Sequence, residues 1–222
     1  MLFNNMSLEN LILAIPALLV GFTFHEYAHA LLADKLGDKT PRFQGRLTLN
    51  PIPHIDPIGF ILILLVGFGW AKPVQTNPSA YRRYYKDDLK VSIAGPVANI
   101  IVAVVSTVVL ILFLKILAFT HLSYNTAIDI IFMILKNIVR WNILLFFLNL
   151  LPIPGFDGFH VLRDLFPKFF YQRADFLVKY QLFIFIALAL PILPGGAVLD
   201  YLIGYPTNFI YAGLMSFASL FF

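Results

Sequence analysis

Residues 18–38 read LLVGFTFHEYAHALLADKLGD, and together with the apolar residues before them they are long enough to cross a membrane as one helix. Two histidines and a glutamate lie within the apolar part of this stretch: His25, Glu26 and His29. Ionisable groups are costly inside hydrocarbon, and where they occur they usually mark a functional site. His25 and His29 are four residues apart, so a helix places them on one face.

The order His-Glu-x-x-His indicates a zinc site. Two imidazoles on one helix face can bind one tetrahedral zinc ion, and the glutamate after the first histidine can act as general base. The alternative is a pair of interfacial histidines near a helix end. Three ionisable groups together in an apolar helix favour the metal. A hydrolytic zinc ion also takes a third protein ligand and keeps an open position for water.

The third ligand is expected in NLLPIPGFDG, residues 149–158. Pro152 and Pro154 interrupt a helix there at about membrane depth, where broken backbone is tolerated only if protein buries it or water lines it. Asp157 follows directly, and an aspartate at that depth needs a partner such as zinc. The alternative is a surface turn, because Asp-Gly is a common turn pair. His160 is a weaker candidate ligand.

The composition indicates an integral membrane protein. Of the 222 residues, 59% are hydrophobic and 13% are charged, whereas about a quarter are charged in soluble domains. The chain has no cysteine, which excludes disulfides and thiolate ligands. We predict one all-α domain over residues 1–222, a polytopic bundle with a catalytic core at about 8–160 and C-terminal helices at about 161–222. Five to six transmembrane helices are expected, from apolar runs at about 8–35, 91–118, 127–152, 177–193 and 207–222.

The basic residues predict how the chain is oriented. Nine of the 16 lysines and arginines lie in residues 35–90 and four in 163–179, whereas 119–126 and 194–206 have none. By the positive-inside rule the two basic segments face the cytoplasm, and the zinc site opens toward that side. Apolar residues 58–69 are too short to span, so they must re-enter or form a half-helix. The net charge of +4 lies mostly in these loops, and we expect no nucleic-acid partner.

Residues 42–50, RFQGRLTLN, alternate between apolar and polar side chains, which predicts a strand. WAKPVQ at 70–75 can pair with it in a small re-entrant β-hairpin. An edge of such a hairpin can bind an unwound substrate through main-chain hydrogen bonds, and the alternative is a hairpin that only plugs the site. The predicted substrate-pairing residues are Arg46, Leu47, Thr48 and Leu49.

Four further polar residues are candidates to stabilise the oxyanion or to position the substrate: Asn149, Asn142, His54 and Asn99. Asn142 and Asn149 are seven residues apart and so lie on the same face of a helix. For His54, the alternative is a loop histidine packed against Asp56. For Asn99, which follows a helix-opening Gly-Pro, the alternative is a hydrogen bond between helices.

The chain resembles the site-2 protease family of intramembrane zinc metalloproteases, in its compact bacterial and archaeal form. The resemblance covers residues 21–160 and implies that His25, His29 and Asp157 bind Zn²⁺ and that Glu26 is the base. Gln75 departs from the usual KPVPVNP. The blocks that carry the resemblance are HEYAH at 25–29, GRLTLNPIPHIDPIG at 45–59, GWAKPVQTNP at 69–78, AGPVAN at 94–99 and NLLPIPGFDG at 149–158.

The resemblance implies that the protein lies in the lipid bilayer of a bacterial or archaeal cell membrane, as a multi-pass protein, and cleaves transmembrane helices of substrate proteins. Two alternatives are a transporter that relays protons or metal and a catalytically silent relative that binds membrane proteins. A transporter predicts inverted repeats, which the sequence does not show. A silent relative is disfavoured because the zinc motif and its glutamate are intact.

Overall fold

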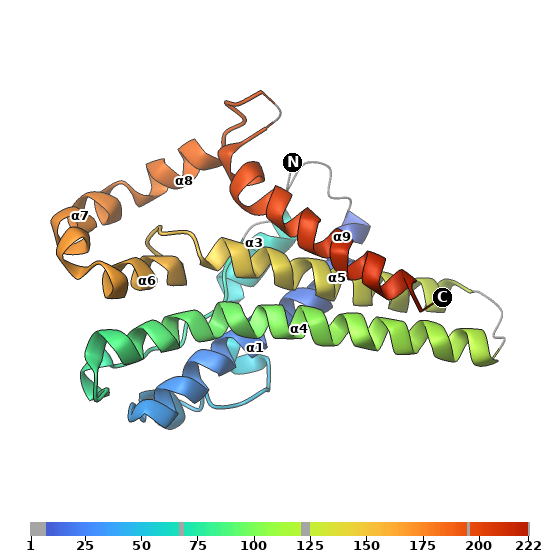
Figure 1. Ribbon diagram of the computed structural model, residues 1–222, viewed down its shortest axis with the longest axis horizontal. Helices are drawn as coiled ribbons and strands as arrows, with labels where there is room; N and C mark the ends of the chain where they lie inside the picture. The colour runs from blue at the N-terminus through green and yellow to red at the C-terminus, as the bar shows by residue number, and fades with distance from the viewer. Residues whose placement is uncertain (1–7, 67–68, 121–124, 195, 222) are drawn as a thin grey trace.

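Three helices form the frame of the computed structural model, which describes residues 8–66, 69–120, 125–194 and 196–221. They are α1 (Leu8–Leu36), α4 (Tyr84–Thr120) and α5 (Thr126–Asn149), and each is long and apolar enough to cross a membrane. All three pack against one another, with α4 running along most of the molecule (Figure 1). The first three predicted spans are therefore confirmed as helices.

Small side chains let α1 approach its neighbours closely, as is common between membrane helices. Ala17, Ala30 and Ala33 of α1 are fully buried. A Cβ atom added to Gly21 would lie 2.6 Å from Leu145 Cδ1 of α5. This contact is one helical turn before His25, so α1 and α5 are in close contact beside the predicted zinc site.

The C-terminal part of the chain differs from the prediction. The expected span at 177–193 is divided between α7 (Pro167–Lys179) and α8 (Gln181–Ala189), and each is too short to cross a membrane. They follow α6 (Asp157–Leu165), and the chain then returns to α9 (Tyr205–Ser219), which packs on α4 and α5. In the part of the chain that the structure describes, three helices meet the criterion for a span, so the predicted number of five to six is not confirmed.

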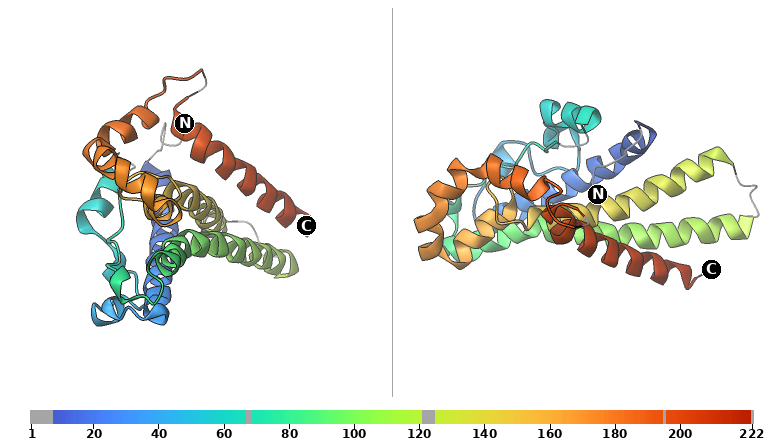
Figure 2. Two further views of the ribbon diagram at one scale, coloured as in Figure 1. Left: turned by 60° about the vertical axis from the view of Figure 1, so that its left-hand side comes forward. Right: turned by 90° about the horizontal axis from the view of Figure 1, so that it is seen from above.

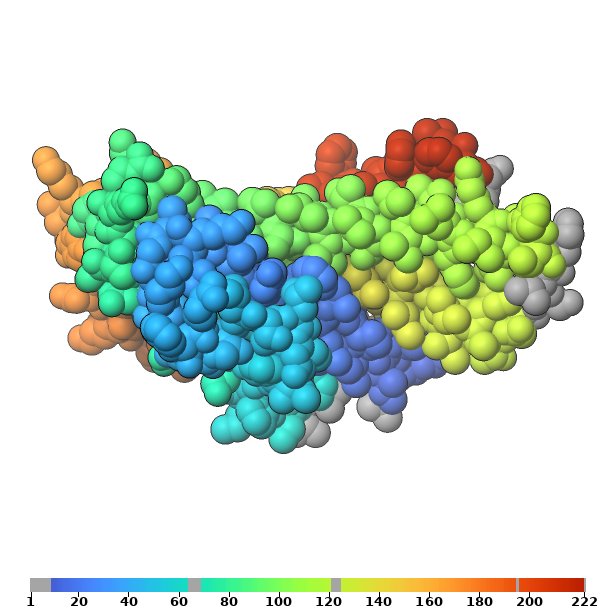
Figure 3. Space-filling view, turned by 90° about the horizontal axis from the view of Figure 1, so that it is seen from below, coloured from blue at the N-terminus to red at the C-terminus, as the bar shows by residue number. Residues whose placement is uncertain are grey.

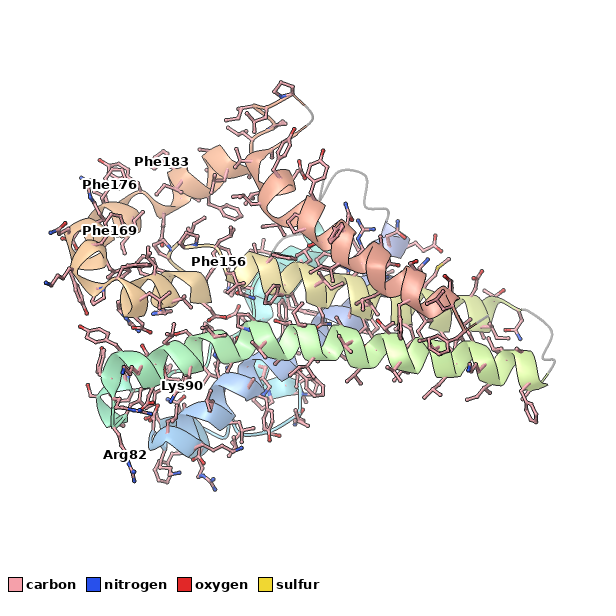
Figure 4. All side chains as sticks on the ribbon, in the orientation of Figure 1. Arg82, Lys90, Phe156, Phe169, Phe176 and Phe183 are labelled. Atoms are coloured by element: carbon pink, nitrogen blue, oxygen red, sulfur yellow. The ribbon has the colours of Figure 1, made fainter. Side chains whose placement is uncertain are left out.

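Helices α6, α7 and α8 form an arm at one end of the molecule (Figure 1). Phe169, Phe176 and Phe183 lie on its outer side (Figure 4) and are 54%, 58% and 69% exposed. The N-terminal end of α4 belongs to the predicted cytoplasmic segment 35–90, and α7 belongs to the predicted cytoplasmic segment 163–179. Both lie at the end of the molecule opposite the C-terminal end of α4 (Figures 1 and 2).

The predicted β-hairpin is absent, since the described residues form no β-strand. Thr40–Phe43 form a short helix, α2, with Pro41 in its first turn, and residues 47–49 are bends. Thr48 Oγ1 and Asn50 Oδ1 each accept a hydrogen bond from the backbone N–H two residues ahead, at 3.1 Å. These local turns take the place of the expected ladder.

An isolated antiparallel bridge between Ile55 and Ala71 is the pairing that does form. It is extended by the Lys72 N–H, which donates to the His54 carbonyl at 2.9 Å. Between the two paired stretches lies α3 (Pro57–Val66), a ten-residue helix that is too short to span, as predicted. In the space-filling view, residues 37–66 form one lobe with the C-terminal half of α1 (Figure 3).

An ion-pair cluster fastens α6 to α4. Arg163 of α6 pairs with Asp88 of α4, and its Nε donates to Asp164 Oδ1 at 2.9 Å. The side chain of Asp88 is 5% exposed and that of Arg163 is 15% exposed. A charge buried to this extent is tolerated only with a partner, so the cluster holds α6 in one position.

We predict that Arg163→Leu destabilises the protein by about 3–5 kcal/mol, because it leaves the buried Asp88 carboxylate without its partner. The double variant Asp88→Leu, Arg163→Leu removes both charges and should recover part of that loss. Unfolding midpoints in detergent micelles measure both. A double variant less stable than Arg163→Leu would contradict this account.

Candidate metal centre

The structure brings His25, His29 and Asp157 together. The Nε2 atoms of the two histidines are 3.0 Å apart. Asp157 Oδ2 lies 3.0 Å from His25 Nε2, and Asp157 Oδ1 lies 3.2 Å from His29 Nε2. Both histidines are buried, at 6% and 9% exposure. Three potential ligand atoms therefore converge on one point inside the protein.

Asp157 reaches this point because the chain reverses after α5. Helix α5 ends at Asn149, and the turn that follows includes Gly155 at a φ of +98°, which glycine adopts readily. Asp157 is the first residue of α6. A Cβ atom on Gly158 would lie 2.3 Å from the Leu150 carbonyl oxygen. The absence of a side chain there lets α6 begin directly beneath the end of α5.

Helix α4 determines which nitrogen of each imidazole carries the proton. His25 Nδ1 lies 2.7 Å from Asn99 Oδ1, and His29 Nδ1 lies 2.7 Å from the Val91 carbonyl oxygen. Both partners are acceptors, so each Nδ1 must be the N–H donor. Each neutral imidazole then has a lone pair on Nε2, which is the atom that faces Asp157.

This arrangement fits a bound cation. The two histidine Nε2 atoms lie 3.0 Å apart, with their lone pairs facing each other and no hydrogen between them. The buried Asp157 Oδ2 receives no hydrogen bond. Tetrahedral zinc with bonds of about 2.0–2.1 Å separates its ligand atoms by about 3.3 Å, close to the distances found here. A Cβ atom on Gly95 would lie 2.4 Å from His29 Nε2 and 2.5 Å from His25 Nε2. The residues present therefore fit zinc, and Gly95 leaves the space beside the ligands.

Glu26 lies in the same cavity and is held by the segment Trp70–Thr76. Its Oε2 accepts a hydrogen bond from the Val74 N–H at 2.7 Å. The buried Arg46 places Nη2 4.0 Å from the same oxygen and also donates to the backbone carbonyls of Pro53 and Lys72. Both contacts hold the Glu26 carboxylate in place beside the ligand atoms.

A cavity of about 690 Å³ opens beside the three ligand atoms and Glu26. Its apolar lining includes Phe22, Trp70, Trp141 and Leu148. Its polar lining includes Thr76, Asn149, His160, Asp88 and Arg163. Such a cavity can hold a stretch of peptide with large apolar side chains while its backbone meets polar groups.

The other predicted residues divide into two groups. Asn149 lines the cavity, and its Nδ2 donates to the Leu145 carbonyl at 3.0 Å. His160 also lines the cavity but does not belong to the group of three ligand atoms. Asn99 and Asn142 are fully buried and bind each other, and they are not among the described residues that line the cavity.

His54 is likewise fully buried and away from the cavity lining. Its Nε2–H donates to the Thr48 carbonyl at 2.8 Å, and burial lowers its pKa, so the ring is neutral. His54 and Asp56, which the alternative would pack together, form hydrogen bonds with different partners. Asp56 instead accepts from the Gly59 N–H at 2.8 Å and caps α3.

Sequence reasoning missed two contributors to the site, Gly95 and the Val74 N–H, and it assigned Arg46 to substrate pairing, whereas the Arg46 side chain lies beside Glu26. Gly95 did leave a signal, because a glycine inside an apolar helix often marks close packing. No comparable sequence signal indicated the contacts that Arg46 and Val74 make with Glu26. Their contacts with Glu26 join segments 20 and 48 residues away along the chain, and no local pattern records them.

We predict that Gly95→Ala greatly reduces zinc binding, because its methyl group would lie within 2.4–2.5 Å of both ligand nitrogens. Gly213→Ala in α9 is the matched control, since a Cβ there meets nothing within 4 Å. Zinc content of the purified proteins measures the effect. Equal zinc content in the two variants would contradict this placement of the metal.

Comparison with known proteins identifies the family. The profile of Peptidase family M50 matches residues 13–141, which include both histidines and Glu26 and end before Asp157. The chain is 41% identical over 178 residues to "Putative zinc metalloprotease YwhC" of Bacillus subtilis, covering 78% of each protein. It is 31% identical over 160 residues to the similarly named Rip2 of Mycolicibacterium smegmatis, covering 68% of this chain and 56% of Rip2. No solved structure matches. The chain belongs to peptidase family M50, the site-2 protease family.

Proposed function

We propose that this protein is an intramembrane zinc metalloprotease that cleaves peptide bonds within or near transmembrane helices of membrane-protein substrates. The observation that carries the proposal is the convergence of His25, His29 and Asp157 beside Glu26, in a cavity between helices of membrane-spanning length. The names of the relatives support a zinc-dependent protease.

The chemistry follows from the positions of these groups. Zinc, when bound, supplies an acidified water and polarises the scissile carbonyl. The Glu26 carboxylate accepts the proton of the attacking water and later returns it to the leaving amine. The Val74 N–H hydrogen-bonds one carboxylate oxygen and so holds it in place. Asn149, the polar candidate that lines the cavity, is placed to orient the substrate or to stabilise the oxyanion.

The substrate must be unwound, because a helix hides its peptide bonds from the protease. We place the extended substrate along Trp70–Thr76, which lines the cavity and contains no regular helix. This replaces the predicted pairing along Arg46–Leu49, where bends and the buried Arg46 side chain leave no strand edge. Backbone groups of an extended segment can bind any substrate sequence, and the apolar side chains that line the cavity then select the substrate's side chains.

We predict that Glu26→Gln abolishes proteolysis but retains zinc, because the glutamate is not a ligand. The double variant His25→Ala, His29→Ala should lose both zinc and activity. Metal analysis and cleavage of a candidate membrane substrate by the purified proteins provide the two measurements. Full zinc occupancy in the double histidine variant would refute the ligand assignment, and unchanged cleavage by Glu26→Gln would refute the role of the glutamate.

We further propose that the active site faces the cytoplasm of a bacterial or archaeal cell. The chain has no cysteine, so single cysteines can report the orientation directly. Cysteine at position 84, in the basic segment, should react with an impermeant thiol reagent only after the cells are opened. Cysteine at position 126, in the uncharged connection, should react from outside, and the reverse pattern would overturn this orientation.

A further inference from the structure

We propose that Asn99 and Asn142 form a buried relay that positions His25 for metal binding, and that neither contacts the substrate. The proposal rests on the proposed zinc site, and it changes the role that the sequence suggested for both residues. It is carried by a continuous set of hydrogen bonds across α1, α4 and α5.

The relay has one consistent arrangement of donors and acceptors. Asn99 Oδ1 accepts from His25 Nδ1–H at 2.7 Å, while Asn99 Nδ2 donates to the Gly21 carbonyl at 3.1 Å and to Asn142 Oδ1 at 3.0 Å. Asn142 Nδ2 in turn donates to the Ile138 carbonyl of its own helix at 2.8 Å. Reversing the Asn99 amide would face its NH₂ toward the imidazole N–H and its oxygen toward two acceptors. The network therefore fixes the orientation of the Asn99 amide. The amide oxygen in turn fixes which nitrogen of the His25 imidazole carries the proton.

The two ends of the Asn99 amide both contact the same turn of α1. Gly21 lies four residues before His25, and the amide binds the backbone of the first and the ring of the second. Asn142 holds the amide from the opposite side, on α5. The His25 ring is thus oriented relative to its own backbone by a side chain that two other helices keep in place.

His29 does not need such a relay, because the Val91 carbonyl accepts its Nδ1–H directly. The acceptor for the His25 Nδ1–H is the side-chain oxygen of Asn99 and not a backbone carbonyl of α4. Without it, the His25 Nδ1–H would lose its partner, and the tautomer with its proton on Nε2 would no longer be disfavoured. That tautomer has no lone pair on the atom that faces His29 and Asp157, so it cannot bind the metal.

Both asparagines are fully buried, and neither is among the described residues that line the cavity. A substrate or an oxyanion in the cavity is therefore not expected to contact them. Partners that hydrogen-bond a metal-bound histidine typically change metal affinity by roughly 10- to 100-fold when they are removed. The simpler reading is that the asparagines only join helices, which predicts a loss of stability without a specific effect on metal binding.

The test compares four variants of the full chain in detergent micelles. Asn99→Leu removes the acceptor for His25, whereas Asn99→Asp keeps an oxygen at that position. Asn142→Leu removes the outer member of the relay. Asn137→Leu is the matched control, because Asn137 of α5 also bonds α1, at the Leu13 carbonyl, but away from the histidines. Each variant is measured for Zn²⁺ affinity by chelator competition and for its unfolding midpoint without metal.

We expect Asn99→Leu to weaken zinc binding roughly 10- to 100-fold and Asn142→Leu to weaken it less. Asn99→Asp keeps the acceptor for His25 but loses both Nδ2 donors, so it should weaken zinc binding less than Asn99→Leu does. Asn137→Leu should lower the unfolding midpoint with affinity unchanged. In histidine-labelled protein without metal, nitrogen NMR should show the Nδ1–H form of His25 in the parent and loss of that preference in Asn99→Leu.

Two results would overturn the relay. One is parental affinity in Asn99→Leu. The other is an affinity loss in Asn99→Asp as large as in Asn99→Leu. A parent protein that binds no zinc would instead refute the proposed zinc site itself, so the two failures are distinguishable. Retained affinity in His25→Ala would likewise refute the site and not the relay alone.

Discussion

Two imidazoles buried in an apolar helix have four ring nitrogens that each need a hydrogen-bond or metal partner, and this requirement constrains how the helices pack. Helix α4 accepts both Nδ1–H groups, through a backbone carbonyl and through the Asn99 side chain. The two Nε2 atoms are then left facing each other and Asp157. An unpaired polar group costs more in a membrane than in water, so α1 and α4 can pack only in the register that makes these bonds.

In lipid the hydrophobic effect does not drive helices together, so close packing contacts stabilise their association instead. Three glycines mark these contacts: Gly21 where α1 meets α5, Gly95 where α4 meets the two imidazoles, and Gly158 where α6 meets the end of α5. At each one a Cβ atom would lie within 2.6 Å of a neighbouring atom. The ligand atoms are thus brought together by backbones that approach without intervening side chains.

The site combines a helical frame with segments that are not part of it. The two histidines and Glu26 belong to α1, whereas Asp157 begins a short helix after a turn and the Val74 N–H comes from an extended segment. Ion pairs and hydrogen bonds hold these segments: Arg163 with Asp88 for α6, and Arg46 with two backbone carbonyls beside Glu26. The helical frame thus positions the two histidines and Glu26, while short segments beside the cavity add Asp157 and the Val74 N–H.

Hydropathy and four-residue spacing are local properties, so the amino-acid sequence alone predicted the three long apolar helices and the two histidines on one helix face. It also pointed to Asp157, through the break in a helix at membrane depth. It predicted a strand at residues 42–50 wrongly, since the alternation there is short and Thr48 and Asn50 bind their own backbone instead. The roles of the polar candidates became clear from the packed fold. Asn99 and Asn142 bind each other, His54 binds the Thr48 carbonyl, and Asn149 faces the cavity. The role of a polar side chain depends on which partner the packed helices bring within hydrogen-bonding distance, and no pattern along the chain records that distance.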